Sequence, residues 1–129
     1  MSHYVFLQLI WIGLGVGFNL VSYFRLKRGK APLMQTPPLI GIGVLGLFIP
    51  IILLGVTDWH AAYLILNLMM ALFISYIGII RHLQVLFSDR SLDGYASRTA
   101  LLIGVGINVF GVGATVWACV TVAGLSGAC

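Results

Sequence analysis

Three histidines, three aspartates and two cysteines are the side chains of this chain that could bind a metal ion. His3, Asp58 and His60 stand near the ends of apolar runs, and two imidazoles with a carboxylate can bind copper or zinc. His3 and His60 could also share a haem iron, which needs two imidazoles at one depth. Interfacial histidines that hydrogen-bond to headgroups or loops account for the same residues. We therefore expect no metal or cofactor from this chain alone, and keep a redox subunit with haem or metal at His60 as an alternative.

Catalysis and proton coupling lack their usual residues here. The chain contains no glutamate, and Asp58, Asp89 and Asp93 all lie outside its long apolar runs. Ionisable groups inside a membrane are the usual sign of ion or proton coupling. The sequence also has no C-x-x-C motif and no nucleophile–base pair or phosphate-binding loop. These absences favour a protein that is not an enzyme by itself.

The composition indicates that the chain is embedded in lipid. Hydrophobic residues make up 60% and charged residues 8%, against about 25% charged residues in soluble proteins. The net charge of +4 does not predict a nucleic-acid partner, because the seven basic residues gather in two short connections. Bases at such places set membrane topology and contact lipid headgroups. The expected partner is the lipid bilayer.

Four apolar runs are long enough to cross that bilayer, which takes about 20 helical residues. They span residues 4–24, 39–56, 61–80 and 100–125. Each must be helical, since lipid offers no partner to backbone N–H and C=O groups. We expect an all-α membrane protein in which one domain, 1–129, forms an antiparallel bundle of four transmembrane helices. The stretch 82–87 is amphipathic and can continue the third helix.

The basic residues predict the orientation of the bundle. All seven lie in the connections 25–38 and 81–99, while the turn at 57–60 and both ends of the chain carry none. Lysine and arginine are enriched in cytoplasmic loops. We therefore expect connections 25–38 and 81–99 in the cytoplasm and both termini on the outer side, most simply in a bacterial cytoplasmic (inner) membrane.

Small and polar residues recur at helical spacing within the runs. Small residues let helices approach closely in lipid, and buried amides need hydrogen-bond partners. The motif Ile-Gly-x-Gly occurs three times and places its two glycines about 200° apart on a helix, which predicts packing on two sides. The positions predicted to face other helices are Gln8, Gly13, Gly15, Gly17, Asn19, Asn67, Ser75, Gly78, Gly104, Asn108, Gly111 and Thr115.

Depth along the helices predicts two polar pairs among these residues. Asn19 and Asn108 lie at similar distances from the basic connections, and Gln8 and Asn67 both lie in the opposite half. We expect Asn19 near Asn108 and Gln8 near Asn67, each contact contributing about 0.6–2 kcal/mol.

Two further functions compete with a redox subunit. The first is a non-catalytic accessory subunit of a larger membrane complex for electron transfer or transport. It is favoured because the helices carry more glycine-lined faces than the packing of one four-helix bundle requires. Its partners are other membrane protein subunits. The second is a small homo-oligomeric channel or carrier for neutral or lipophilic solutes, lined by Asn67, Ser75, Asn108 and Thr115. The sequence does not decide whether lipid or quinone lies between the helices.

Overall fold

The computed structural model describes residues 2–87 and 95–126, with side chains up to residue 124. Within these residues the chain is helical and contains no strand. The helices are α1 (His3–Lys27), α2 (Pro38–Leu53), α3 (His60–Ile74), α4 (Arg81–Leu86) and α5 (Arg98–Ser126). A 3-10 turn η1 (Leu54–Val56) extends α2, and a π-helical segment η2 (Ser75–Ile80) joins α3 directly to α4.

Four helical stretches are long and apolar enough to cross a membrane: 3–27, 38–56, 60–86 and 98–124. Each contains one predicted apolar run. The third is longer than its run because α4 continues it to Leu86. The predicted connection 81–99 was therefore wrong at its start, whereas the predicted continuation of the third helix is confirmed. Residues 88–94 of that connection lie outside the described residues.

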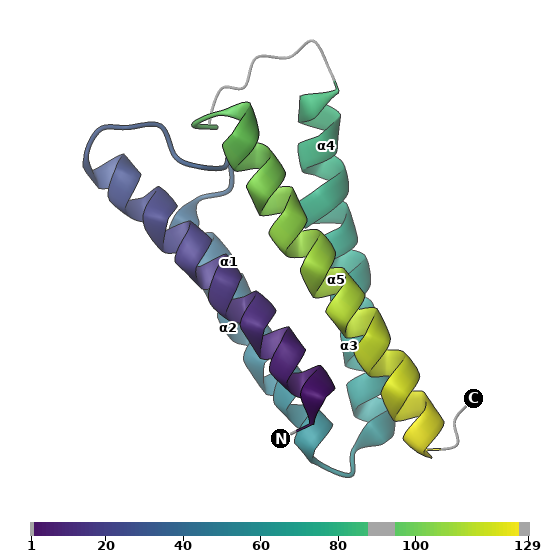
Figure 1. Ribbon diagram of the computed structural model, residues 1–129. Coiled ribbons are helices and arrows are strands. Elements are labelled where there is room, and N and C mark those ends of the chain that lie inside the picture. The colour runs from purple at the N-terminus through teal and green to yellow at the C-terminus, as the bar shows by residue number, and fades with distance from the viewer. Residues whose placement is uncertain (1, 88–94, 127–129) are drawn as a thin grey trace.

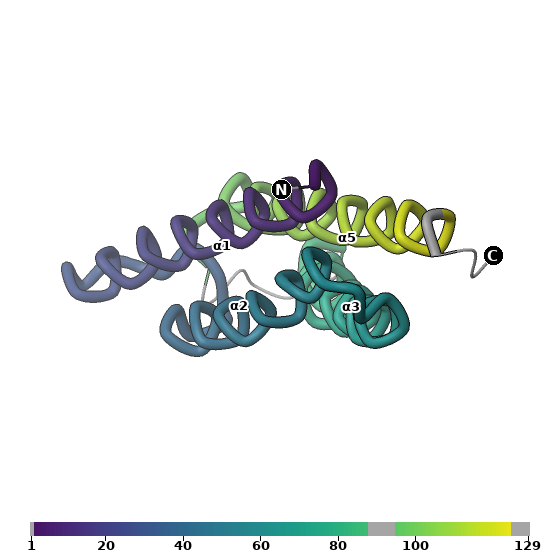
Figure 2. The backbone as a smooth tube through the Cα atoms, turned by 90° about the horizontal axis from the view of Figure 1, so that it is seen from below, coloured from purple at the N-terminus to yellow at the C-terminus, as the bar shows by residue number. Residues whose placement is uncertain are grey.

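The helices form two layers (Figure 2), with α1 and α5 in one and α2 and α3 in the other. Figure 1 shows the two termini and the turn between α2 and α3 at one end, which we call the terminal end. We call the opposite end, with residues 28–37 and 95–97, the basic end. α2 packs mainly on α1, and α3 packs mainly on α5. α2 and α3 touch each other much less, so the second layer is loosely closed.

Glycines allow close approaches between neighbouring helices. A Cβ atom at Gly15 of α1 would lie 2.7 Å from Leu45 of α2. Gly111 of α5 lies against the indole of Trp11, whose side chain is fully buried. Because these positions have no Cβ, large side chains from the neighbouring helix rest directly on backbone.

Other glycines face away from the chain. A Cβ at Gly13, Gly17, Gly43, Gly106 or Gly113 would meet no atom within 4 Å. The expectation that each of these helices packs on two sides is therefore wrong for the described residues of a single chain: Gly15, Gly41 and Gly104 face neighbours, while the other glycine of each motif, Gly13, Gly43 or Gly106, would meet nothing. Gly13 and Gly17 contact no helix of this chain.

The connection after α1 is held by short-range bonds. Gly29 has a φ of +72°, and the backbone N–H of Lys30 donates to the carbonyl of Arg25 over 2.9 Å, so α1 ends in a left-handed cap that favours glycine. The hydroxyl of Ser22 accepts from the N–H of Leu33 over 3.0 Å. These bonds fold the connection back so that Met34 packs against the helices, and its side chain is buried.

Candidate functional site

A polar junction joins three helices in the terminal half of the molecule. The Gln8 amide donates to Asn67 Oδ1 over 2.7 Å and to Thr115 Oγ1 over 3.2 Å. The Tyr63 hydroxyl donates to Gln8 Oε1 over 2.6 Å. The predicted pair Gln8–Asn67 is confirmed. All four side chains are fully buried. The junction therefore connects α1, α3 and α5 and is not a surface that a solute could reach.

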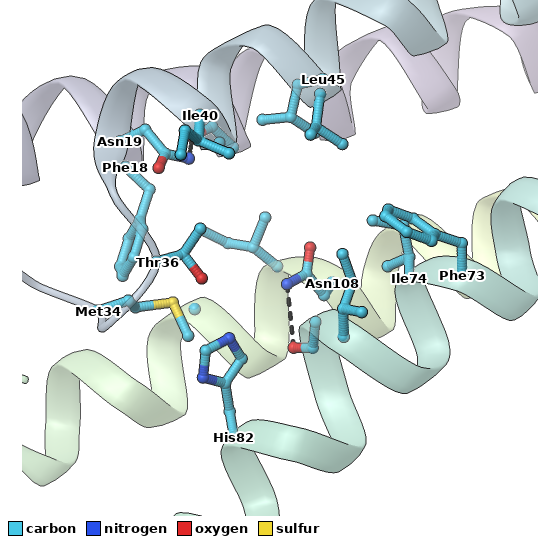
Figure 3. Close-up of a pocket in the computed structure, with 17 residues that line it drawn as sticks. Phe18, Asn19, Met34, Thr36, Ile40, Leu45, Phe73, Ile74, His82 and Asn108 are labelled. Carbon is cyan, nitrogen blue, oxygen red and sulfur yellow. Dashed lines mark hydrogen bonds between the residues drawn. The ribbon is translucent and has the colours of Figure 1, made fainter.

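An apolar cavity of about 250 Å³ opens where α2 and α3 separate towards the basic end. Its walls come from α1, the 34–36 segment, α2, α3, η2, α4 and α5. Figure 3 shows Leu45 and Phe73 at one end of it and Met34, Thr36 and His82 towards the other. The residues that line it include Gly15, Phe18, Asn19, Met34, Thr36, Ile40, Gly41, Val44, Leu45, Phe73, Ile74, Ile77, Gly78, His82, Gly104, Ile107 and Asn108.

Two amides stand in the cavity wall, on different helices. Asn19 Nδ2 donates to the carbonyl of Gly15 in its own helix over 2.8 Å, and its side chain rests on Gly41 of α2. Asn108 Nδ2 donates to the carbonyl of Gly78 over 3.1 Å (Figure 3). The predicted Asn19–Asn108 pair is thus not formed as a hydrogen bond. Each amide satisfies a backbone carbonyl instead, and both border the same space.

The bond from Asn108 reaches a π-helical segment. A π-helix shifts the backbone register by one residue and is frequent at functional sites. Here Gly78 lies within η2, and a Cβ there would lie 2.7 Å from the Asn108 amide. The small residue therefore lets the side chain of α5 reach the main chain of η2 and fixes the cavity wall.

A polar cleft of about 420 Å³ continues the cavity at the basic end. The two spaces share Thr36, Ile77 and His82. The cleft is lined by Gln35, Thr36, Pro37, Ile77, Arg81, His82, Gln84, Val85 and Tyr95. The site as a whole is therefore amphipathic, with an apolar inner part and a polar mouth.

His82 and Tyr95 are in contact where the two spaces meet. His82 Nδ1 and the Tyr95 hydroxyl lie 2.7 Å apart, and both side chains are buried. Burial raises the pKa of the Tyr95 hydroxyl, and the nearby Arg81 charge partly offsets this rise. The phenol is thus neutral at physiological pH and remains available as a hydrogen-bond donor.

Eight of the twelve residues predicted to face other helices lie at one of these two places. Gln8, Asn67 and Thr115 form the junction, whereas Gly15, Asn19, Gly78, Gly104 and Asn108 line the cavity. Ser75 is half-buried at the start of η2. Asn67 and Thr115 are enclosed by the junction within one chain, and the homo-oligomeric channel lined by these residues stays a prediction.

The structure gives no support to a metal or haem at the terminal end. In the described part of the chain, no three histidine, cysteine, aspartate or glutamate side chains lie together. The predicted group His3, Asp58 and His60 is therefore not assembled as ligands. His3 Nε2 instead accepts a hydrogen bond from Trp117 Nε1 over 3.0 Å, which occupies the nitrogen lone pair that a metal would need.

Sequence reasoning missed the parts of the site that come from connections. Met34, Thr36 and Tyr95 lie outside the predicted helices, and helical spacing says nothing about where such residues fold back. His82 begins the stretch 82–87 that was predicted to continue the third helix, and its side chain is buried. The fourth member of the junction, Tyr63, lies four residues before Asn67, the spacing that places two side chains on one helix face.

The chain matches no known family model, and comparisons with curated proteins and with solved structures found no similar chain.

Proposed function

We propose that this protein is a non-catalytic integral membrane protein that holds a lipid-soluble small molecule between α2, α3, η2 and α5. The observation that supports this proposal is the apolar cavity of about 250 Å³, which adjoins a polar cleft. Small-molecule sites are mostly apolar with a few placed polar groups, and they commonly lie between the helices of a bundle. Asn19, His82 and Asn108 are those groups here.

The placement of the molecule in the membrane is part of this proposal. The four apolar helices are taken to span the bilayer as an antiparallel bundle, and the basic end faces the cytoplasm, because Arg25, Lys27, Arg28 and Lys30 follow α1 closely and such residues are enriched on that side. Both termini then lie outside, and a bacterial inner membrane is the simplest location. A lipid-soluble ligand would enter sideways from the inner half of the bilayer.

Photolabelling in lipid nanodiscs tests this function. Two long-chain probes with a diazirine in the tail, one an alcohol and one a carboxylic acid, are irradiated with the protein, and labelled peptides are mapped by mass spectrometry. We expect label from at least one probe on cavity residues that are buried from the outer surface, such as Leu45 and Ile74. Labels confined to lipid-facing positions such as Leu47 and Leu72, which are 72% and 65% exposed, would refute a site.

A pair of variants makes this test specific. Val44 lines the cavity, whereas Leu47, three residues later on α2, faces outward. Val44→Phe places extra volume in the cavity and should reduce cavity labelling severalfold. Leu47→Phe adds a similar ring on the outer face and should leave it unchanged. Equal labelling in the two variants would contradict the proposal.

A second candidate function is that of an accessory subunit in a larger membrane complex. It is favoured by the outward glycines, of which Gly13 and Gly17 lie on α1 and Gly106 and Gly113 on α5. These two helices form one layer, and open glycines allow a foreign helix to pack closely. Purification of the tagged chain from its own cells in mild detergent, with mass spectrometry and an absorption spectrum, tests it. Stoichiometric foreign subunits support it, a Soret band identifies a haem partner, and a lone colourless species contradicts it.

A further inference from the structure

Arg81 gives the mouth of the cavity its charge. It is the only aspartate, glutamate, lysine or arginine among the residues that line the apolar cavity or the polar cleft. Within residues 2–87 and 95–126 no ion pair to its guanidinium is found. An exposed arginine beside a concave polar surface can bind a carboxylate or phosphate through two parallel N–H donors.

The other polar groups of the cleft can add donors. Gln35 and Gln84 line it together with Arg81, while the Tyr95 hydroxyl, which also lines it, is already hydrogen-bonded to His82. The described residues that line it include no carboxylate, and Asp58, the one acidic residue that the structure describes, lies in the turn between η1 and α3 at the terminal end. The electrostatic preference of the cleft is therefore for a negatively charged group. This preference gains strength because the cleft borders apolar space, where charge interactions are less screened than in water.

The adjoining apolar cavity sets the rest of the ligand. It begins at Thr36, Ile77 and His82, the residues that it shares with the cleft. Its volume is about 250 Å³, and a water molecule in the liquid takes about 30 Å³. The space therefore accommodates a segment of one hydrocarbon tail.

We propose that the site binds a single-tailed lipid with an anionic head, its carboxylate or phosphate at Arg81 in the cleft and its tail in the apolar cavity. This inference rests on the proposed function and adds to it the charge of the head and the number of tails. His82 and Tyr95, whose polar atoms lie 2.7 Å apart, lie where the cavity and the cleft meet. They would therefore be next to the bond between the head and the tail of the ligand.

The two photoactivatable probes also test this inference, because they share a tail and differ in the head. At mildly alkaline pH the acid is ionised and the alcohol is neutral. In nanodiscs of zwitterionic lipid, the acid should label cavity residues at about tenfold lower concentration than the alcohol, the effect of one charge-assisted contact at a half-open site. The preference should fall to nearly none in Arg81→Gln and be largely retained in Arg81→Lys.

Arg98→Gln is the matched control. Arg98 begins α5 at the same end of the molecule but lines neither the cavity nor the cleft, so its loss changes the net charge equally. The acid preference should survive in this variant. If Arg98→Gln removes the preference as strongly as Arg81→Gln does, a general surface potential and not a site attracts the acid, and the inference is overturned.

The remaining outcomes separate this inference from the proposed function. Equal cavity labelling by acid and alcohol would overturn the anionic head and leave a lipid-soluble ligand in place. Stronger competition by two-tailed phosphatidylglycerol than by an unlabelled fatty acid would overturn the single tail. No cavity labelling by either probe would refute the proposed function and the inference together.

Discussion

Replacing Gln8 by leucine tests whether the buried polar junction holds the helices together. Leucine is of similar size but cannot hydrogen-bond, so Gln8→Leu removes three bonds, of 2.6, 2.7 and 3.2 Å, in one step. Hydrogen bonds between membrane helices average about 0.6 kcal/mol and reach about 1.7 kcal/mol. The variant should therefore lose about 2–5 kcal/mol of unfolding free energy. The Tyr63 hydroxyl and the Asn67 carbonyl would be left without this partner.

Reversible unfolding in mixed micelles, followed by tryptophan fluorescence, measures this loss. The single variants Gln8→Leu and Asn67→Leu are compared with the double variant. Because both partners of the 2.7 Å bond disappear in the double variant, its loss should be smaller than the sum of the single losses by at least about 0.5 kcal/mol.

Two threonines of α5 supply a matched control. Thr115→Val removes the hydroxyl that accepts from Gln8, while Thr121→Val removes one that only donates to the carbonyl of Trp117, four residues earlier. We expect the first change to cost about 1 kcal/mol and the second to be close to neutral. Unchanged stability of Gln8→Leu, with additive losses in the double variant, would refute the role of the junction.

Three further predictions concern single sites. Gly111→Ala should destabilise by about 1–3 kcal/mol because its Cβ would collide with the Trp11 ring, whereas Gly113→Ala, which meets nothing, should be neutral or slightly stabilising in the same unfolding assay. Gly29→Ala should cost about 1–2 kcal/mol, since its φ of +72° disfavours a Cβ; equal stability would contradict the cap. Burial raises the pKa of Tyr95 above its usual 10.0, so the folded state resists deprotonation. This contribution is complete below about pH 10 and lost as pH rises further; Tyr95→Phe should show a smaller alkaline decline in stability than the wild type.

The membrane helices were predictable because lipid leaves the backbone few choices. A run of about 20 apolar residues must be helical to satisfy its own N–H and C=O groups, and the four predicted runs lie within the four helical stretches. The pair Gln8–Asn67 was predictable for a related reason. A buried amide needs a partner at its own depth, and few polar groups are present there.

The cavity was not predictable, because it depends on where side chains are missing. Asn19 and Asn108 lie at similar depth, and the rule that pairs amides failed for them. Backbone carbonyls were nearer: Gly15 lies one turn before Asn19, and Gly78 lies in a π-helical segment whose register the sequence does not announce. Both carbonyls belong to glycines, which leave the main chain accessible. Small residues were predicted to allow tight helix packing. At these two glycines the missing side chain also leaves a backbone carbonyl open to an amide.

The glycines of the three Ile-Gly-x-Gly motifs are only partly accounted for by contacts within one chain. Their inward members, Gly15, Gly41 and Gly104, each make room for a named side chain, namely Leu45, Asn19 and Met34. Their outward members meet nothing, yet a glycine inside a helix costs about 1 kcal/mol relative to alanine. That cost is not offset by any contact in the described chain. An additional helix lying close against the outward glycines would offset it, and co-purification and photolabelling therefore address different faces of the molecule.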